Sequence, residues 1–341
     1  MTAERVDEPD FAGRVTIADV ARLAQVSPTT VSHVLSGKRR VRGATGERVL
    51  EAIRELGYRP NFAAQQLRTR RSRMVAVIVP DITNPFYSTL TRGLADVVGG
   101  EEYGTYVCNT DGSLPRERKF MSDVLDRGAD GIVMASVSPV SENDLTKARF
   151  GTPIVCIGDS IDDQEVDLVT AEHETGARTA AAHLVMRGAR RIAMIQGPPE
   201  AGTGRDDGFK EALAEASVTW DPALMVRGDW TRAGGRAAMR ELMERDPRPD
   251  AVFCANDLTA IGAMDVTREL GLRIPEDIRL VGFDDVDAAT IVTPALTTVR
   301  NPAYETGAEA GRLLVSRMLG DYTGSGRTIT LQCPLVERDS A

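Results

Sequence analysis

The sequence predicts two unlike folded parts: a small bundle of short helices near the N-terminus, and a larger α/β part with parallel sheets. Two observations support this. Apolar residues recur at helical spacing through residues 16–56, and after Met74 short apolar runs alternate with amphipathic stretches of helix length. The 341 residues also exceed one compact core of ordinary size, so more than one domain is expected.

The composition excludes several classes of protein. Hydrophobic residues make up 42% of the chain and charged residues 27%, as in ordinary globular proteins. Four scattered cysteines and only three histidines argue against a disulfide framework or a zinc site, and no cofactor is expected. The N-terminus lacks the apolar core of a signal peptide, and no apolar run is long enough to span a bilayer. A cytoplasmic protein is therefore expected.

Charge is distributed unevenly along the chain. Residues 14–73 carry 13 Lys and Arg against 4 Asp and Glu, a net charge of +9. The rest of the chain then carries 28 against 46, a net charge of −18. A basic module on an acidic body suggests that the two parts have different partners. Charge alone does not decide between nucleic-acid binding and a plain solvated surface.

Three short helices are predicted in the basic module. The first covers residues 16–24, with Thr16 as its N-cap. After a short turn, Ser27 caps a second helix and Pro28 takes its first position, where a missing N–H costs nothing. A third helix is expected at about 44–56. The short helices and the tight turn predict a helix-turn-helix unit.

The second helix of such a unit lies in the major groove of DNA. Its exposed face here carries hydroxyl groups and an imidazole, which can hydrogen-bond to phosphates and base edges. A small helical bundle with a polar surface is the alternative, and the basic charge and the tight turn argue against it. The exposed residues are Pro28, Thr29, Thr30, Ser32 and His33.

The basic segment 57–73 follows this unit. Pro60 holds the residue before it in extended geometry, and Asn61 can cap a short helix. Leu67 is apolar on a segment too short to form a core, so it suits a wedge in the minor groove, with arginines as phosphate anchors. A linker that packs Leu67 on its own domain is the alternative, and composition alone favours it. The arginines are Arg68, Arg70, Arg71 and Arg73.

In the acidic body, seven apolar runs read as strands, separated by stretches of helix length such as 86–100, 115–127, 174–187 and 258–270. This alternation predicts parallel sheets with helices on both faces. Such sheets bind ligands beyond the carboxyl ends of their strands. The runs are MVAVIVP, TYVCNT, GIVMA, PIVCIG, RIAMIQG, AVFCAND and RLVGFDD.

Polar and aromatic residues follow these strands and are the candidates for binding. Carboxylates and amides accept hydrogen bonds from hydroxyls. The planar guanidinium group of arginine donates hydrogen bonds in a fixed geometry, and tryptophan offers an apolar ring face. This mixture suits a sugar or another small polar ring. For any single Asn or Asp, a helix N-cap is the favoured alternative. The candidates are Asp81, Asn84, Phe86, Asn109 to Asp111, Ser136, Gly197 to Arg205, Trp230, Asn256, Asp257, Asp284 and Asp285.

Other functions fit the sequence less well. The segment GPPEAGTGRDDGF has Asp207 at the third glycine position of a dinucleotide loop, and its acidic pair would repel a pyrophosphate. An α/β enzyme would need a nucleophile and a base, and no elbow motif accompanies the histidines. An exported sugar-binding transport protein would need a signal peptide and no helix-turn-helix unit.

Two motifs carry a specific resemblance. VTIADVARLAQVSPTTVSHVLSGKRRV and then GYRPNFAAQQLR resemble the headpiece and hinge of the lactose-repressor (LacI) family, and TTVSH is most similar to its purine-repressor branch. The match continues to VERDS and leaves residues 1–13 outside. It implies a regulator, expected to be a repressor of metabolic genes, that binds pseudo-palindromic operator DNA as a homodimer. A small effector, expected to be a sugar, would control that binding.

The resemblance assigns roles to residues that contact DNA. Thr29 and His33 read bases, and Leu67 inserts at the central step of the operator. Pro28 lies where some members carry a base-contacting side chain, and it can donate nothing. Phosphates are held by Thr16, Thr30, Ser32 and Asn61, and Ala64, Arg68 and Arg70 are further contacts to DNA.

The resemblance also assigns the effector site. The R-x-x-G-F of Arg205 to Phe209 is similar to the segment whose arginine contacts effector, and Trp230 takes the aromatic stacking position. Glu172 and His173 stand where most members have an Asp-Asn pair, and the loop before Arg205 is shorter than in the purine repressor. The other implied contacts are Asn256 and Asp284, and Asn84, Phe86 and Ser136 from the N-terminal lobe.

The implied fold is a helix-turn-helix headpiece and hinge helix, followed by a two-lobed α/β domain like the periplasmic binding proteins. Effector bound between the lobes would change the affinity for operator. We expect an inducer, which releases repression; a corepressor, which strengthens operator binding, is the alternative. A dimer is expected, since no leucine-heptad tail follows VERDS. The expected ranges are 14–60 for the headpiece, 61–73 for the hinge and 74–338 for the effector domain, with lobes at about 74–170 plus 302–321 and 171–301 plus 322–338.

Overall fold

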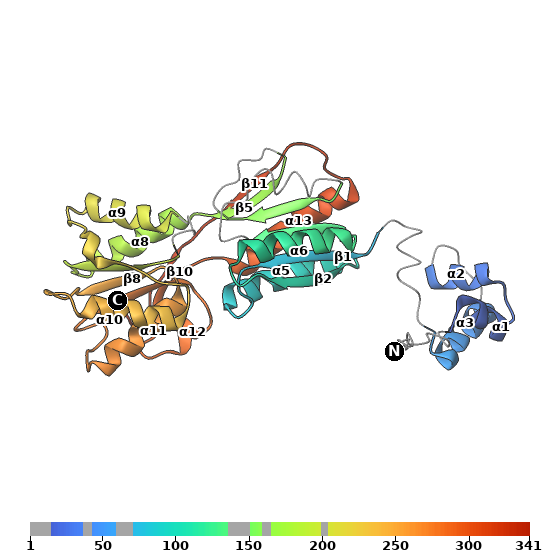
Figure 1. Ribbon diagram of the computed structural model, residues 1–341, viewed down its shortest axis with the longest axis horizontal. Helices are drawn as coiled ribbons and strands as arrows, with labels where there is room; N and C mark the ends of the chain where they lie inside the picture. Colours follow the sequence, from blue (N-terminus) through green and yellow to red (C-terminus); the bar gives the residue numbers. More distant parts are fainter. Residues whose placement is uncertain (1–14, 37–42, 59–70, 136–150, 159–164, 199–203) are drawn as a thin grey trace, which may run out of the picture. The chain divides into compact units, whose positions relative to one another are not determined.

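The computed structural model describes residues 15–36, 43–58, 71–135, 151–158, 165–198 and 204–341 (Figure 1). The chain divides into two compact units, Met1–Ser72 and Arg73–Ala341. The described part of the first unit is helical, and the second unit is α/β with two sheets. The predicted fold class is therefore confirmed.

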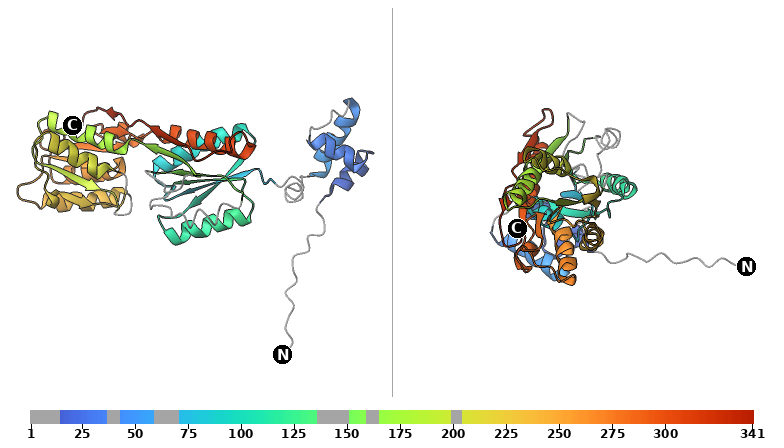
Figure 2. Two further views of the ribbon diagram at one scale, coloured as in Figure 1. Left: turned by 90° about the horizontal axis from the view of Figure 1, so that it is seen from above. Right: turned by 90° about the vertical axis from the view of Figure 1, so that its left-hand side faces the viewer.

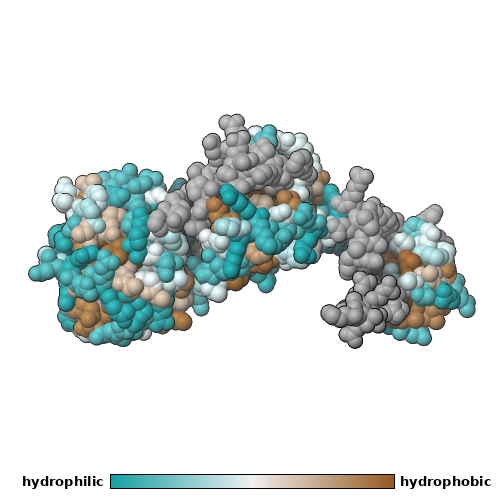
Figure 3. Space-filling model, viewed as in Figure 1, coloured by the Kyte–Doolittle hydropathy of each residue, from teal (hydrophilic) through white to brown (hydrophobic). Residues whose placement is uncertain are grey.

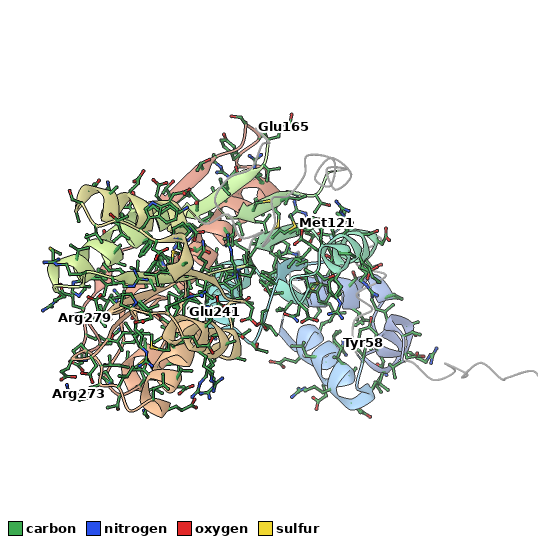
Figure 4. The ribbon with its side chains drawn as sticks, turned by 60° about the vertical axis from the view of Figure 1, so that its left-hand side comes forward. Tyr58, Met121, Glu165, Glu241, Arg273 and Arg279 are labelled. Carbon is green, nitrogen blue, oxygen red and sulfur yellow. The ribbon has the colours of Figure 1, made fainter. Side chains whose placement is uncertain are left out.

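The first unit contains α1 (Ile17–Leu23), α2 (Pro28–Ser36) and α3 (Gly43–Leu56), close to the predicted ranges. The three helices bury one small apolar cluster, and Tyr58, labelled in Figure 4, packs against it. The apolar spacing of the sequence thus decides which side of each helix faces inward. The buried residues are Val20, Ala21, Ala24, Val31, Val49 and Ala52.

Two polar side chains begin the first two helices, as the sequence predicts. Thr16 and Asp19 form a reciprocal capping box, in which the Asp19 carboxylate accepts from the backbone N–H of Thr16 at 3.0 Å. Oγ of Ser27 accepts from the backbone N–H of Thr30 at 3.1 Å. Each cap satisfies N–H groups that a helix leaves unpaired at its start.

The second unit is built on two sheets, which define its first and second lobes. Their strand orders are β11-β5-β4-β3-β1-β2 and β12-β10-β9-β8-β6-β7, and every pairing is parallel except that of β12 with β10. The first sheet comprises β1 (Met74–Val79), β2 (Gly104–Asn109), β3 (Gly131–Ala135), β4 (Ile154–Ile157), β5 (Asp167–Ala171) and β11 (Thr328–Leu331). The second comprises β6 (Ile192–Gln196), β7 (Met225–Arg227), β8 (Ala251–Cys254), β9 (Arg279–Asp284), β10 (Thr297–Arg300) and β12 (Leu335–Val336).

Helices cover both faces of each sheet, which explains why the central strands are apolar throughout. In the first lobe α5 (Pro85–Gly100) and α13 (Ala303–Leu319) pack together on one face, and α6 (Leu114–Asp126) covers the other (Figure 2). In the second lobe α8 (His173–Met186) and α9 (Arg205–Glu215) cover one face. The opposite face carries α10 (Arg232–Met243), α11 (Asp257–Glu269) and α12 (Ala288–Ile291), beside the 3₁₀ turn η1 (Pro222–Leu224).

The chain passes between the two sheets three times: after β5, after β10 and after β11. The expected lobe ranges also change lobe three times, but the last expected boundary is wrong, because β11 at residues 328–331 lies in the first sheet. β11 pairs in parallel with β5 of the first sheet, with Thr328 opposite Leu168. Its partner lies about 160 positions away in the sequence, so no local pattern could assign this short strand to a sheet.

A buried carboxylate fixes the late segments of the chain to the first lobe. Asp167, at the start of β5, is fully buried and accepts two hydrogen bonds of 2.8 Å from Nε and Nη2 of Arg317. Nη2 of Arg327 donates to the same carboxylate at 2.7 Å. Burial raises the pKa of Asp167, but these hydrogen bonds outweigh it and hold the pKa at about 2. The cluster ties α13 and β11 to the sheet.

The surface is that of a protein whose apolar groups are mostly inside. The face of the second unit in Figure 3 is largely hydrophilic, with smaller apolar areas between. Among the helices that the structure describes, none is both long and apolar enough to cross a bilayer.

Candidate functional site

The first candidate site is α2 of the helical unit. Pro28 and Thr29 are exposed, and Ser32 and His33 are half-buried. The half-buried Thr30 exchanges a hydrogen bond of 2.9 Å between its Oγ1 and Oγ of Ser27, so part of its bonding capacity holds the helix start. The remaining predicted contacts lie outside the described residues, namely Asn61, Ala64, Leu67, Arg68 and Arg70, as does Ser136 of the effector site.

The second candidate site begins with Arg205, the first residue of α9. Its side chain is only 6% exposed. Nη1 donates to the backbone carbonyl of Ala255, and Cζ lies 3.8 Å from the centre of the Phe283 ring. The same Cζ lies 5.2 Å from the ring of Trp230. Strand ends far apart in sequence therefore meet around one guanidinium group, as the parallel topology predicts.

One edge of this guanidinium has no close acceptor among the described residues. Nε of Arg205 is buried without a hydrogen-bond partner, and Nη2 lies 3.7 Å from Oδ1 of Asp284. Arg317 shows how that edge is normally used, because its Nε and Nη2 each donate to Asp167 at 2.8 Å. A buried donor left unpaired costs about 1–3 kcal/mol. The Nε–Nη2 edge of Arg205 is thus suited to a ligand that presents two neighbouring acceptors.

Asp284 is the carboxylate beside that edge. It ends β9 with a left-handed φ of 109°, and its side chain is 7% exposed. Oδ1 accepts a hydrogen bond of 3.1 Å from Nδ2 of Asn301. Burial raises the pKa of Asp284, and the positive charge of Arg205 offsets this only in part. The contacts with Arg205 and Asn301 both fall on Oδ1, which leaves Oδ2 able to accept a hydrogen bond from a ligand.

Two neighbours hold Trp230: Asn256 bonds to its backbone, and Gly197 leaves room for its ring. Its φ is 66°, and Nδ2 of Asn256 donates to its backbone carbonyl at 3.0 Å. A Cβ atom at Gly197 would lie 2.3 Å from the indole ring, so only glycine allows the ring this position. Oδ1 of Asn256 also accepts from Thr259 N at 2.9 Å, which caps α11. Asn256 therefore has the capping role that the sequence left open.

The first lobe brings aromatic side chains to the site. Asn84 caps α5 by accepting from the backbone N–H of Phe86 at 3.0 Å. This is the helix N-cap that the sequence offered as the alternative to a contact with effector. The rings of Phe86 and Tyr87 meet edge to face at 5.2 Å. Burial and then the charge of Asp284 raise the pKa of Tyr87. Tyr87 of the first lobe therefore lies within electrostatic reach of the second-lobe carboxylate, and sequence reasoning missed it.

The remaining acidic candidates have structural partners. Oδ1 of Asp81 accepts from Thr83, and Oδ1 of Asn109 accepts from the Ile82 N–H at 2.7 Å. The buried Asp257 accepts from Val286 N at 2.8 Å and from Thr298 Oγ1 at 2.5 Å. Two further carboxylates form ion pairs: Asp111 with Arg116, and Asp285 with Arg300 and Arg338. These residues hold turns and strand ends in place.

The sequence did not predict a small group of hydrogen-bonded polar side chains beside Trp230. Nε2 of Gln196 donates to the carboxylate of Asp206, and Nη1 of Arg227 donates to the Gly197 carbonyl at 3.2 Å. Arg227 lies 3.9 Å from Asp206, so its charge is matched by a carboxylate. On the other side, the ring of His173 lies 5.9 Å from that of Phe283. Neighbouring strands create this grouping, which no spacing in the sequence reveals.

The described residues include no group of three His, Cys, Asp or Glu side chains placed to hold a metal ion. All four cysteines are free and buried. Burial raises the pKa of the Cys333 thiol to about 12, so this thiol stays protonated at neutral pH.

Comparison with known families matches both parts of the chain. Residues 16–61 match the bacterial regulatory proteins of the lacI family, and residues 181–341 match the periplasmic binding protein-like domain. The ribose operon repressor of Halalkalibacterium halodurans is 36% identical over 306 residues, which cover 89% of this chain and 90% of the relative. The transcriptional repressor CytR of Escherichia coli K12 is 33% identical over 327 residues, which cover 95% and 96%.

Solved structures agree over nearly the whole chain. The Lac repressor dimer bound to operator and the anti-inducer ONPF superposes with a TM-score of 0.84 at 26% identity, covering 96% of this chain and 98% of that one. The complex of the transcriptional regulator CelR with cellobiose gives a TM-score of 0.73 at 34% identity, covering 96% and 100%. The chain therefore belongs to the LacI family of bacterial regulatory proteins, and it is a DNA-binding transcriptional regulator that responds to a small molecule.

Proposed function

We propose that the effector is an uncharged, hydroxyl-rich ring of the sugar class, bound by Arg205, Asp284 and Trp230. The observation that carries this proposal is the Nε–Nη2 edge of Arg205, buried beside Asp284 without a close acceptor among the described residues. Two neighbouring hydroxyl oxygens match the fork of such an edge.

The nearby carboxylate selects hydroxyls over an acidic group. A hydroxyl can accept from Arg205 and at the same time donate to Asp284. A carboxylate or phosphate only accepts, and it would bring a second negative charge beside the buried Asp284. The other guanidinium here, that of Arg227, already faces Asp206. The described part of the site therefore offers no unmatched positive charge to an anion.

The aromatic residues complete the proposed site. Trp230 offers its face to the apolar C–H side of a sugar ring. Phe86 and Tyr87 approach from the first lobe, so an effector that contacts them as well links the two lobes. Asn84 positions Phe86 through its helix cap, and Asn256 positions Trp230 by donating to its backbone carbonyl. The structure of CelR contains cellobiose and that of a LacI-family regulator from Enterococcus faecium contains ribose, which supports a sugar.

On the DNA side, we propose that the dimer presents two copies of α2 to a pseudo-palindromic operator. Thr29 and His33 read base edges, and Thr16, Thr30 and Ser32 hold phosphates. Pro28 makes only apolar contact, because it has no donor. Asn61, Ala64, Leu67, Arg68 and Arg70 continue the contact through the hinge. We further propose that the protein acts at the chromosome in the cytoplasm, as a repressor and without enzymatic turnover.

Calorimetric titration of the full chain tests the effector class. The panel pairs neutral sugars with their charged counterparts: ribose with ribose 5-phosphate, cellobiose with cellobionic acid, and glucose with glucuronate and glucose 6-phosphate. We expect one neutral sugar to bind and its charged counterpart to bind at least tenfold more weakly. Tighter binding of a phosphate or acid would overturn the proposal.

A second experiment separates the two signs of control. Operator DNA is selected from a randomised pool with the full chain, and its affinity is measured with and without the sugar that binds. Weaker operator binding with sugar identifies an inducer, the arrangement we propose, and tighter binding identifies a corepressor. Conversion of the sugar during incubation would contradict the proposed absence of turnover.

A further inference from the structure

The boundary between the two units coincides with an unusual residue. The first unit ends at Ser72 and the second begins at Arg73. Arg73 has a left-handed φ of 60°, which few residues other than glycine adopt without a structural reason. The surrounding structure must therefore hold this backbone in place.

Both the backbone and the side chain of Arg73 are held. Its backbone N–H donates to Oδ2 of Asp130 at 2.8 Å, and its carbonyl accepts from Gly104 N at 2.9 Å. Nη1 donates to the backbone carbonyl of Glu101 at 3.1 Å, and Cζ lies 5.2 Å from the ring of the buried Tyr103. The residue that precedes β1 is therefore held by hydrogen bonds and a ring contact from the segment before β2 and by a hydrogen bond from the segment before β3.

The sheet alone does not require the Asp130 side chain. The pairing of β1 with β3 begins at Val75 opposite Gly131, and the backbone N–H of Asp130 already donates to the Met74 carbonyl at 2.8 Å. The carboxylate adds a contact one residue beyond that register, on the backbone N–H of the first residue of the second unit.

We propose that Arg73 and Asp130 form a clasp that fixes how the DNA-binding part of the chain is attached to the body. Both are positioning residues for operator binding. In a dimer the clasp acts twice and so sets which spacing of operator half-sites the protein accepts, because that spacing is a geometric property of the assembly. The inference rests on the proposed DNA binding and adds to it a determinant of half-site spacing.

The substitution Asp130→Ala tests the clasp, with Asp126→Ala as the matched control. Asp126 is an exposed carboxylate at the end of α6, with no side-chain hydrogen bond or ion pair among the described residues. Each substitution removes one negative charge, which by itself favours DNA binding. The probe is a palindromic duplex selected from randomised DNA with the unaltered full chain, together with versions that have one or two base pairs inserted between the half-sites.

We expect Asp130→Ala to bind the selected duplex at least tenfold more weakly than Asp126→Ala. We also expect its preference for the selected spacing over the longer ones to fall at least fivefold. A merely structural role would lower the melting temperature but would leave that preference intact in the folded fraction. A spacing preference equal to that of Asp126→Ala would overturn the proposal.

A second pair of variants covers the case in which Asp130→Ala does not fold. Arg73→Gly keeps the backbone N–H but releases the φ constraint and the side-chain contacts, whereas Arg116→Gly removes the same charge from the exposed first turn of α6. Loss of spacing preference in Arg73→Gly alone supports the clasp, and equal behaviour of the two overturns it. If the unaltered chain selects no palindromic DNA, the proposed DNA binding itself is wrong.

Discussion

Asn301 donates a hydrogen bond of 3.1 Å from its Nδ2 to Oδ1 of Asp284, and it does so from the segment that carries the chain from β10 back to the first lobe. The carboxylate that we propose to bind effector is therefore held by a residue of an interlobe connection. We therefore expect a displacement of Asp284 by a ligand to shift that connection as well. This contact is a physical basis for coupling between the effector and the arrangement of the lobes.

The first prediction concerns Asn301→Ala. Loss of the hydrogen bond should weaken sugar binding about tenfold, because a hydrogen bond to a charged group contributes about 1.5–3 kcal/mol. The bond also lowers the pKa of Asp284, so the variant should lose affinity at a higher pH than the unaltered protein as the solution is acidified. Titration calorimetry between pH 7 and pH 5 measures both effects. An unchanged affinity and pH profile would contradict the coupling.

The second prediction concerns the binding fork itself. Arg205→Ala and Asp284→Asn should each weaken sugar binding by about 2–4 kcal/mol, since each leaves the other buried partner without its counterpart. Operator binding without sugar should remain, because the headpiece is unchanged. Arg227→Ala is the control, because Arg227 is half-exposed and paired with Asp206. Equal losses in Arg227→Ala and Arg205→Ala would show that the fork is not the main contact.

The third prediction concerns the support beneath Trp230. Gly197→Ala places a methyl group where the indole ring now lies, so the ring must move and sugar affinity should fall about tenfold. Trp220→Phe makes Trp230 the sole tryptophan, and its fluorescence then reports the displacement. Gly100→Ala is the control, since a Cβ atom there meets nothing within 4 Å. An unshifted emission spectrum in Gly197→Ala would mean that the ring does not depend on this contact.

The fourth prediction concerns acid stability. The pKa of Asp167 is about 2 in the folded protein, below its ordinary value of 3.8. Its contribution is therefore complete above about pH 3.8 and is lost as the pH falls from there through about 2. At neutral pH, Asp167→Asn leaves the partly buried Arg317 and Arg327 without a carboxylate and should lower the free energy of unfolding by about 1–3 kcal/mol.

Chemical denaturation at neutral pH compares this variant with Glu309→Gln. Glu309 pairs with Arg312 on the surface of the same helix, α13, and should contribute less than about 0.5 kcal/mol. Similar destabilisation by the two substitutions would show that the buried Asp167 cluster contributes no more to the free energy of unfolding than a surface ion pair.

The fifth prediction concerns base reading. His33→Ala should lose discrimination at one symmetric pair of operator positions, by about 1–3 kcal/mol per contact. Arg70→Ala should weaken all DNA sequences alike, because a phosphate contact carries no sequence information. Binding to a library of operator variants distinguishes the two effects. Uniform loss in both proteins would reject the division of roles.

Sequence reasoning succeeded where the determinants are local or follow from topology. The helices that were given a range lie within one or two residues of it, because their apolar periodicity and caps, such as Thr16 and Ser27, are contained in short segments. Arg205, Trp230 and Asp284 could be grouped because ends of neighbouring parallel strands meet at one edge of a sheet.

The assignments that sequence reasoning left open or missed share a physical reason. Asn84 and Asn256 carry the same amide whether it caps a helix or binds a ligand, and only the three-dimensional contacts distinguish these roles. Asn301 bonds to Asp284 from the end of the neighbouring strand, and Tyr87 of the first lobe lies within electrostatic reach of the same carboxylate, so both depend on packing between segments distant in the sequence. β11 was assigned to the wrong lobe because its partner strand is remote in the sequence.

The three crossings between the sheets also bear on how the protein is made. During translation, β6 to β10 of the second lobe are synthesised in one continuous stretch. The first lobe cannot be completed until α13 and β11 are synthesised, near the end of translation. Until then α5 lacks the helix against which Leu90 and Leu94 pack, and the apolar face of the first sheet is open to water. A message truncated after residue 300 would therefore yield a chain with an unfinished first lobe, prone to aggregation and degradation, although its DNA-reading helices are intact.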